Sequence, residues 1–260
     1  VCGRATGGGV DRVGYDGRGV MRGMGHGARA WLENVVPKCT VCGISSWSES
    51  LLYAVNSMRP MARVVTQIIV QVLGGIGLSV TNSTAARLTE RLAQVSGAEP
   101  VFLLVPGICS DDKSRRAMMN ERSCRYVFEF FDRISFILMG IGSLEPSRFL
   151  SDSGNRMTED EQRHLRELGA VGDVVQRYLN QSGKPVKSSF DSRVIGISYD
   201  QMMRIPRRVG VAGGMRKFDA IRAALRGGCL TTLVTDAEVA RRLLENPSVF
   251  LFGIPAYRFL

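Results

Sequence analysis

The sequence is poor in the side chains that most often carry catalysis. Only two histidines, His26 and His164, occur among its 260 residues. It also contains no Ser/His/Asp arrangement, no H-E-x-x-H pair and no G-x-S-x-G elbow. Acid–base chemistry would therefore have to depend on carboxylates or lysines, and we expect neither a metal centre nor a cofactor.

Cysteine is scarce as well, and its six copies do not form a framework like that of small secreted proteins. Cys39 and Cys42 have C-x-x-C spacing, but no second cysteine pair or histidine pair follows to complete a metal site. We expect both in a strand over residues 39–44, where side chains three positions apart point to opposite faces. They are therefore predicted to be buried thiols.

The sequence lacks an apolar run long enough to cross a bilayer. The longest one, over residues 64–80, is interrupted by Gln67 and Gln71 and contains a Gly-Gly turn. No signal peptide opens the chain. We therefore expect a cytoplasmic protein without a membrane partner, and its length with 45% hydrophobic residues is enough to bury a full core.

Acidic residues are fewer than basic residues, so the chain has a formal net charge of +10. Such a balance favours anionic partners, such as nucleic acid or phosphorylated metabolites, although the arginines are spread along the chain. Residues 1–27 are rich in Gly and Arg without an apolar period, and we expect a disordered leader before one domain over residues 28–260. The leader is interpreted either as a basic nucleic-acid tail or as an unusual Gly/Arg-coding segment.

From residue 28 onward, strand-like and helix-like segments alternate. The expected strands cover residues 39–44, 64–73, 100–105, 134–141, 194–198, 208–212 and 230–235. The expected helices cover residues 28–34, 49–58, 84–96, 113–131, 158–169, 215–225 and 237–244. This alternation predicts an α/β fold with a mostly parallel sheet and helices on both faces. Ligands of such sheets bind at the carboxyl ends of the strands, so the turns there are candidate sites.

Two of these turns lie in the first half of the chain. Ser48, Glu49 and Ser50 begin a helix, where free amide groups attract anions, although Ser48 could equally be a helix cap only. Gly74 and Gly75 follow a buried strand and permit a ligand to approach the backbone closely.

Two further turns lie in the second half. Asp173 ends the expected turn over residues 169–173, where it would either accept hydrogen bonds from sugar hydroxyls or only close the turn. Gly213 and Gly214 end a strand, and Lys217 follows in the first turn of a helix. A cation at a helix N-terminus is unfavourable unless an anion lies beside it, so Lys217 is either a ligand contact or a solvated side chain.

Nine segments in this order resemble the SorC/DeoR-type sugar-binding domain of bacterial transcription regulators. They are GISSWSESL (43–51), QVLGGIG (71–77), RLTERLA (87–93), LLVPGI (103–108), GIGSLEPS (140–147), GAVGD (169–173), RVIGIS (193–198), GVAGGMRKFDAIRAALRGG (210–228) and LVTDAEVARRLL (233–244). The resemblance covers roughly residues 28–244 and rests on many separate motifs that agree in order and spacing.

The resemblance implies a Rossmann-like sheet akin to sugar-phosphate isomerases and deaminases. It implies a ligand-sensing domain that binds a sugar or sugar phosphate and controls DNA binding by a helix-turn-helix, which this chain lacks. Relatives assemble as dimers or tetramers, so a homodimer or homotetramer is expected. The family's phosphate-binding turn would fall on Ser48, Glu49 and Ser50, its pocket acid on Asp173, and its Gly-Gly-x-x-Lys on residues 213–217.

The sequence departs from the family pattern at two positions. Glu49 stands in a turn where many relatives have Gly and Thr, and its carboxylate would repel a phosphate, so a neutral sugar or polyol is an alternative ligand. Leu73 stands where some relatives have a ligand-binding Arg. Two other functions remain open: an isomerase- or deaminase-like enzyme with Glu49 or Asp173 as the base, and nucleic-acid binding through the leader.

Overall fold

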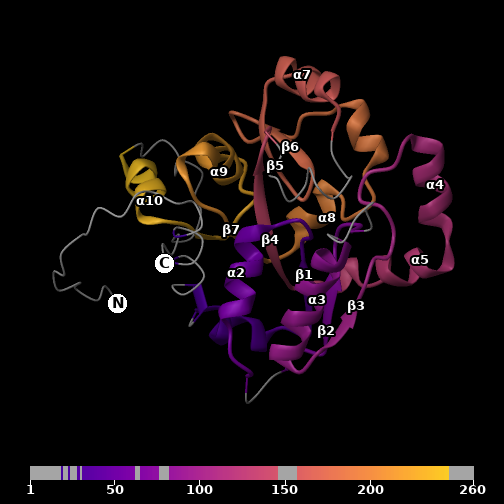
Figure 1. Cartoon of the computed structure of the whole chain (residues 1–260), viewed down its shortest axis with the longest axis vertical. Coiled ribbons are helices and arrows are strands. Elements are labelled where there is room, and N and C mark those ends of the chain that lie inside the picture. Colours follow the sequence, from indigo (N-terminus) through magenta and orange to yellow (C-terminus); the bar gives the residue numbers. More distant parts are fainter. Residues whose placement is uncertain are drawn as a thin grey trace.

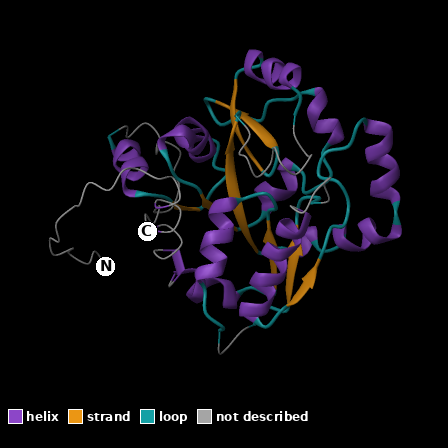
Figure 2. Cartoon of the chain, viewed as in Figure 1, coloured by secondary structure: helices purple, strands orange, loops and turns teal. Residues whose placement is uncertain are grey.

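The computed structural model describes residues 19, 23, 28, 29, 31–61, 65–75, 82–145 and 157–245. The expected disorder of the leader therefore falls almost wholly outside the described residues. The described chain is an α/β fold, as predicted, with a mostly parallel sheet at its centre (Figures 1 and 2).

Parallel strands form the central sheet in the order β3-β2-β1-β4-β7-β8. Their bounds are β1 Val41–Ile44, β2 Ile68–Gln71, β3 Glu99–Val101, β4 Phe136–Ser143, β7 Arg207–Val211 and β8 Thr232–Val234. The chain winds outward in one direction from β1 and in the other direction from β4. The carboxyl ends of β1 and β4 therefore meet at the point where the winding reverses, which is where sheets of this type bind ligands.

β4 is longer than its neighbours and belongs to two pairings. Its first part is parallel to β1 and β7, and its last residues pair antiparallel with β5 (Ala170–Val174), which in turn pairs with β6 (Arg177–Asn180). Two predictions were wrong here. Residues 169–173 were expected to be a turn but form most of β5, and the glycines Gly140 and Gly142 were expected to end β4 but lie inside it.

Helices cover both faces of the parallel sheet. On one face, Ile44 and Leu138 pack in a core with α2 (Glu49–Ser57), α3 (Asn82–Ser96) and the helical residues 31–35. On the other face, Ile137 and Met139 share a core with four further helices. These are α5 (Arg122–Phe128), α8 (Tyr199–Arg204), α9 (Phe218–Arg226) and α10 (Ala237–Leu244). None of the described helices is both long and apolar enough to cross a membrane.

A smaller third core lies beside the hairpin of β5 and β6, at the top of Figure 1. It includes Leu165 of α7 (Glu159–Glu167) together with Ala170 and Tyr178 of the hairpin. α7 begins at Thr158 as the acidic first turn predicts, with Thr158 and Glu161 in a capping box.

Two expected elements differ in the structure. The helix expected over residues 113–131 is two helices, α4 (Asp112–Asn120) and α5, because Glu121 adopts an extended conformation between them. The strand expected over residues 194–198 is not regular. It forms only the isolated bridges of Val194 with Ile108 and of Gly196 with Leu73, since Gly196 touches the backbone of the β2 side at this point.

The C-x-x-C pair is buried, but its geometry was predicted wrongly. Cys39 precedes β1 and follows the short 3₁₀ turn Val36–Lys38, so the two thiols are not on opposite faces of a strand. They lie in the same core, and a hydrogen bond with Cys42 lowers the pKa of the Cys39 thiol. Both thiols are free, as expected.

Candidate functional site

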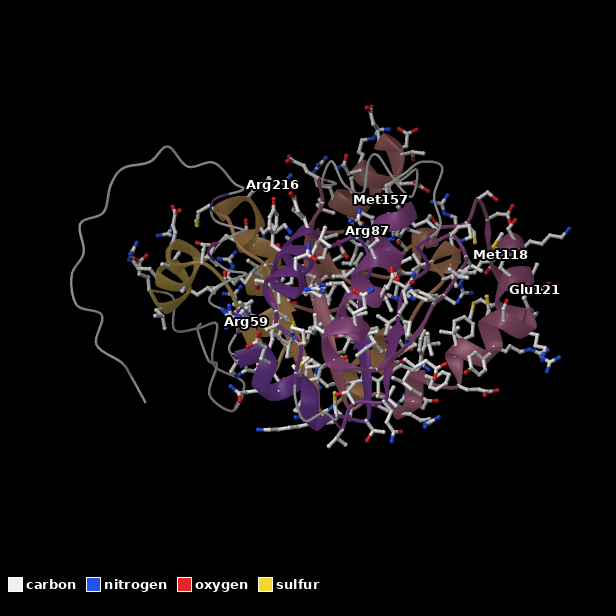
Figure 3. All side chains as sticks on the ribbon, turned by 60° about the horizontal axis from the view of Figure 1, so that its bottom comes forward. Arg59, Arg87, Met118, Glu121, Met157 and Arg216 are labelled. Carbon is white, nitrogen blue, oxygen red and sulfur yellow. The ribbon has the colours of Figure 1, made fainter. Side chains whose placement is uncertain are left out.

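A cavity of about 80 Å³ opens at the reversal point between β1 and β4. Its wall comes from the turn after β1, the end of β4, the β5–β6 hairpin and the turn after β7. The residues that line it are Ser45, Ser46, Trp47, Ser48, Glu49, Leu73, Gly140, Ile141, Gly142, Ser143, Leu144, Glu145, Met157, Asp173, Val175, Gln176, Tyr178, Arg216 and Lys217. Met157 and Arg216 are labelled in Figure 3. The cavity thus combines hydroxyl, carboxylate, amide and cationic groups in one place.

The serine-rich turn after β1 forms one wall, and its side chains fix the backbone around it. Ser45 Oγ accepts a hydrogen bond from the Gly140 amide at 3.1 Å, and Ser46 Oγ donates to the Leu73 carbonyl at 2.8 Å. Ser48 is the N-cap of α2, because its Oγ accepts from the Leu51 amide at 3.2 Å. The expected cap role of Ser48 is therefore present, and the same residue also lines the cavity.

Two glycines of β4 make room for the polar groups of the cavity. A Cβ on Gly140 would lie 2.5 Å from Ser48 Oγ, and one on Gly142 would lie 2.0 Å from Asp173 Oδ1. Alternate residues of a strand face the same side, so both glycines open the same face. Residues 140–142 are therefore part of a close-packed strand and not a turn. The side chains of Ser48 and Asp173 pack against its two glycines.

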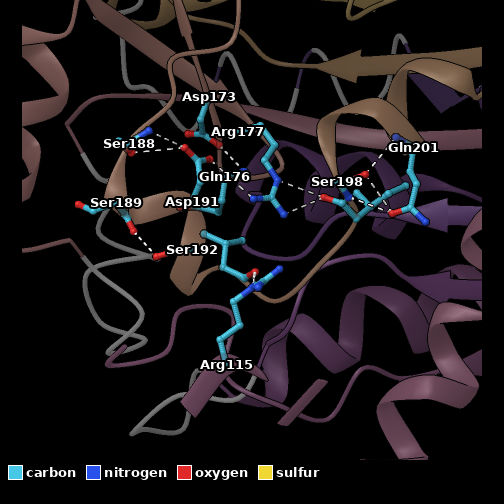
Figure 4. Close-up of polar contacts among 12 residues, drawn as sticks. Arg115, Asp173, Gln176, Arg177, Ser188, Ser189, Asp191, Ser192, Ser198 and Gln201 are labelled. Atoms are coloured by element: carbon cyan, nitrogen blue, oxygen red, sulfur yellow. Dashed lines mark hydrogen bonds and ion pairs between the residues drawn. The ribbon is translucent and has the colours of Figure 1, made fainter. Parts of the chain in front are cut away.

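Asp173 reaches the cavity from β5, opposite Gly142 in the antiparallel register. Its side chain is buried, and Oδ2 accepts a hydrogen bond from the Gln176 amide at 2.8 Å (Figure 4). Burial raises the pKa of Asp173 to about 6, although this hydrogen bond and the charge of Lys217 oppose the shift. Near neutral pH the carboxylate is therefore mostly ionised and able to accept further hydrogen bonds.

Lys217 closes the cavity from the turn after β7. It ends the 3₁₀ turn Met215–Lys217 and is the N-cap residue of α9, so the helix begins slightly later than predicted. The side chain is half-buried, and burial lowers the pKa of Lys217, as does the nearby charge of Arg216. The negative charges of the Asp173 and Glu49 carboxylates oppose that shift.

Four of the nine predicted site residues therefore share the cavity: Ser48, Glu49, Asp173 and Lys217. Glu49 is exposed at the mouth, in the first turn of α2.

The other five predicted residues do not line the cavity, and their positions indicate structural roles. Ser50 is buried on α2, and Gly75 is buried beyond β2. Gly74 packs so closely that a Cβ would lie 2.5 Å from the Pro106 carbonyl oxygen. Gly213 is buried, and Gly214 has a φ of 87° and donates its amide hydrogen to Asp236 at 2.7 Å.

Several residues that line the cavity were not predicted from the sequence. Three of them share an unusual backbone conformation. Trp47, Val175 and Gln176 have φ values of 58°, 50° and 60°, and they are the only described residues other than glycine with positive φ. All three line the cavity. Such strained conformations persist where the surrounding structure holds them and often occur at functional sites. No sequence pattern at these positions indicates positive φ.

The described residues offer no cluster that could hold a metal ion at the cavity. No group of three or more His, Cys, Asp or Glu side chains in the described ranges is placed to hold a metal ion. His164 is exposed on α7 and does not line the cavity, and His26 lies outside the described residues. The groups that are present can hydrogen-bond a small polar molecule, because they include both oxygen acceptors and cationic donors.

Known proteins resemble this chain along most of its length. A family model described as "Putative sugar-binding domain" matches residues 12–245. The deoxyribonucleoside regulator of Bacillus subtilis (strain 168) is 24% identical over 231 residues, which are 89% of this chain and 72% of that protein. The erythritol catabolism regulatory protein EryD of Brucella abortus (strain 2308) is 30% identical over 183 residues, which are 69% of this chain and 56% of that protein.

A solved structure shares the fold. The full-length sorbitol operon regulator SorC from Klebsiella pneumoniae superposes with a TM-score of 0.79 at 21% sequence identity, over 88% of this chain and 73% of that one. The present chain therefore spans between about half and three quarters of the length of these three proteins.

Proposed function

This chain belongs to the family of sugar-binding domains of transcriptional regulators, and on that premise we propose that its cavity at the β1/β4 reversal point binds the effector. The effector is a sugar or a sugar phosphate. Its binding controls DNA recognition by another part of the full regulator, which acts in the cytoplasm as a homodimer or homotetramer.

The observation that carries the proposal is the meeting of Asp173 and Lys217 at one cavity. They come from strands far apart in the sequence, yet the pKa of each is affected by the charge of the other. A buried carboxylate accepts hydrogen bonds from hydroxyl groups, and a half-buried ammonium group donates to hydroxyl or phosphate oxygens. This pair of chemistries suits a polyhydroxylated ligand.

The charges around the cavity bear on whether the ligand is phosphorylated. Lys217 and Arg216 attract an anion, whereas Glu49, Glu145 and Asp173 repel one at close range. The cavity volume of about 80 Å³ is small beside the roughly 300–1,000 Å³ of drug-sized pockets. The ligand is therefore compact. The relative affinity of its phosphorylated and unphosphorylated forms will show whether the cationic or the acidic side chains dominate the electrostatics of the cavity.

Calorimetric titration and thermal unfolding of the chain test the proposal directly. The probes are matched pairs: D-ribose and D-ribose 5-phosphate, erythritol and erythritol 4-phosphate. We expect at least one probe to bind and to raise the midpoint of thermal unfolding, because a ligand at 100 times its Kd stabilises the folded state by about 2.7 kcal/mol. If none of the four binds at millimolar concentration, the proposed effector class is wrong.

The same samples separate sensing from catalysis. Glu49, Asp173 and Glu145 are carboxylates that line the cavity, and the enzyme hypothesis names Glu49 or Asp173 as the base. We expect ribose 5-phosphate and glucosamine 6-phosphate to be recovered unchanged after incubation with the protein, as shown by product analysis. Isomerisation or deamination at a rate that follows protein concentration would contradict a purely sensing role.

A further inference from the structure

The loop between β5 and β6 holds a glutamine in a conformation that its side chain disfavours. The loop has two residues, Val175 and Gln176, and both have positive φ. Two-residue hairpin loops of this kind usually contain Asn or Gly, because these residues tolerate positive φ. A valine and a glutamine here are costly choices, and the hydrogen bond from the Gln176 amide to Asp173 holds the loop in place.

The side chain of Gln176 is buried at the cavity with one polar atom unpaired. Only 6% of the residue is exposed, and it lines the cavity beside Asp173. Within the described ranges, no group hydrogen-bonds to the carboxamide oxygen Oε1. Buried polar atoms in folded proteins are nearly always paired, so an unpaired acceptor at a binding cavity indicates a partner that comes from the ligand.

A purely structural explanation does not account for both features. If the loop only had to turn, glycine would relieve the positive φ at position 176 without loss. If the side chain only had to fill space, an apolar residue would avoid burying an unpaired oxygen. Gln176 combines a strained backbone with an unpaired buried oxygen. A hydrogen bond from a bound molecule to this oxygen would explain both features.

We propose that Gln176 determines ligand specificity: its carboxamide oxygen accepts a hydrogen bond from a ligand hydroxyl next to the one held by Asp173. The inference rests on the proposed function, because it concerns the same cavity. An acceptor pair at this wall selects a neutral polyhydroxy region of the ligand, since a phosphate group has no hydrogen to donate when fully ionised. The hydroxylated part of the ligand therefore lies against the β5–β6 hairpin, and any phosphate lies away from it.

The test compares three substitutions of Gln176 with a matched control. Gln176→Met removes the oxygen and keeps the length of the side chain. Gln176→Gly removes the side chain and suits the positive φ, so it keeps the variant folded. Gln176→Glu keeps an acceptor oxygen. Gln181→Met is the control, because it makes the same change at an exposed glutamine outside the cavity.

Affinity is measured by calorimetry with D-ribose, D-ribose 5-phosphate, erythritol and erythritol 4-phosphate, and thermal unfolding is measured without ligand. We expect Gln176→Met and Gln176→Gly to weaken binding about 10-fold or more, with an unchanged or higher unfolding midpoint for the glycine variant. We expect Gln176→Glu to bind the unphosphorylated probes within a few-fold of wild type, and Gln181→Met to bind like wild type.

Three results would overturn the proposal, and they can be told apart. Wild-type affinity in both Gln176→Met and Gln176→Gly would overturn the role of Gln176 and leave the effector site standing. An equal loss in Gln176→Glu and Gln176→Met would show that the amide nitrogen donates and that the oxygen is not the acceptor. Failure of the wild-type protein to bind any of the four probes would overturn the proposed function, and this inference with it.

Discussion

The parallel sheet and the β5–β6 hairpin contribute to the same cavity in different ways. The parallel strands β1 and β7 end at the cavity, and the turns that follow them deliver the serine residues and Lys217. The hairpin carries polar side chains within its own strands and loop, including Asp173 and Gln176. The parallel part therefore contributes Lys217, Glu49 and serine residues at the rim of the cavity, and the hairpin contributes Asp173 and Gln176 from its wall.

The two regions are joined by β4, which is parallel in its first part and antiparallel in its last. Gly142 lies in the antiparallel part, directly opposite Asp173. The comparison suggests that the rim controls ligand charge and that the hairpin controls ligand shape.

The largest effect is expected at the rim, from Lys217→Ala. Loss of a charge-assisted hydrogen bond costs roughly 1.5–3 kcal/mol, so affinity for the effector should fall about 10- to 150-fold. The fall should be greater for D-ribose 5-phosphate than for D-ribose, as measured by calorimetry. Lys184→Ala is the control, because Lys184 is exposed on the far side of the hairpin and does not line the cavity. Unchanged affinity in the Lys217→Ala variant would show that the charge of Lys217 does not contribute to effector binding.

The second-largest effect is expected at the junction between the two regions, from the substitution Gly142→Ala. The new Cβ would lie 2.0 Å from Asp173 Oδ1, so the hairpin must shift. We expect the free energy of unfolding to fall by about 1–3 kcal/mol in urea titrations, and effector binding to weaken at the same time.

Gly210→Ala provides the comparison for the junction. Gly210 lies in β7, and its added Cβ would meet only the ends of side chains: the two Cδ atoms of Leu230 at 2.8 and 2.9 Å and Cδ1 of Ile141 at 3.3 Å. A flexible side chain moves more readily than a hairpin, so we expect a smaller loss of stability and unchanged binding. Equal losses in the two variants would show that β4 does not couple the hairpin to the sheet in the way described.

The smallest effect is expected from pH acting on Asp173. Its pKa is 3.8 in an ordinary environment and about 6 in the folded protein, so the folded state holds this proton more tightly. Its contribution to stability is therefore fully present below pH 3.8 and is lost as pH rises through 6. The hydrogen bonds that the Asp173 carboxylate accepts from ligand hydroxyls follow the opposite trend, and affinity for D-ribose should fall about 5-fold as the carboxylate is protonated.

The Asp173→Asn variant tests whether Asp173 causes the pH dependence of stability and of ligand affinity. The amide cannot ionise, so the unfolding free energy of this variant should change less than that of wild type between pH 4 and pH 6 in urea titrations. Its affinity should also be flat in pH calorimetry. Asp132→Asn, at an exposed carboxylate outside the cavity, should keep the wild-type pH dependence of both. A wild-type pH profile in Asp173→Asn would place the titrating group elsewhere.

Much of the parallel part was predictable, because its signals are local. α10 has the expected bounds, Ala237–Leu244, and Thr158 and Ser48 begin helices as their side chains indicate. The strands were placed correctly from their apolar runs, although β2 and β3 are shorter than expected. Even so, only part of the candidate site was found, because a glycine pair such as Gly74 and Gly75 has the same appearance in a ligand turn and in a packing contact.

The hairpin was not predictable from local signals. Its loop, Val175 and Gln176, lacks the Asn-Gly pattern of a tight turn. Its first strand was taken for a turn because Gly169 precedes it and Gly172 lies within it. Gly142 and Gly172 are small because Asp173 and Ala220 pack against them, and such contacts depend on residues far away in the sequence. The same holds for Cys39 and Cys42, whose proximity depends on a 3₁₀ turn before β1.

The sequence by itself determined the α/β class, the boundaries of some helices such as α10 and, through its ordered motifs, the family. These depend on periodicity, caps and turn residues, which act over a few positions. Only the tertiary structure decided that β4 changes partners and that Asp173 and Lys217 line one cavity. It alone also decided that Val175 and Gln176 are held at positive φ. Those features are set by close packing between segments distant in the chain, and such packing energies exceed local preferences.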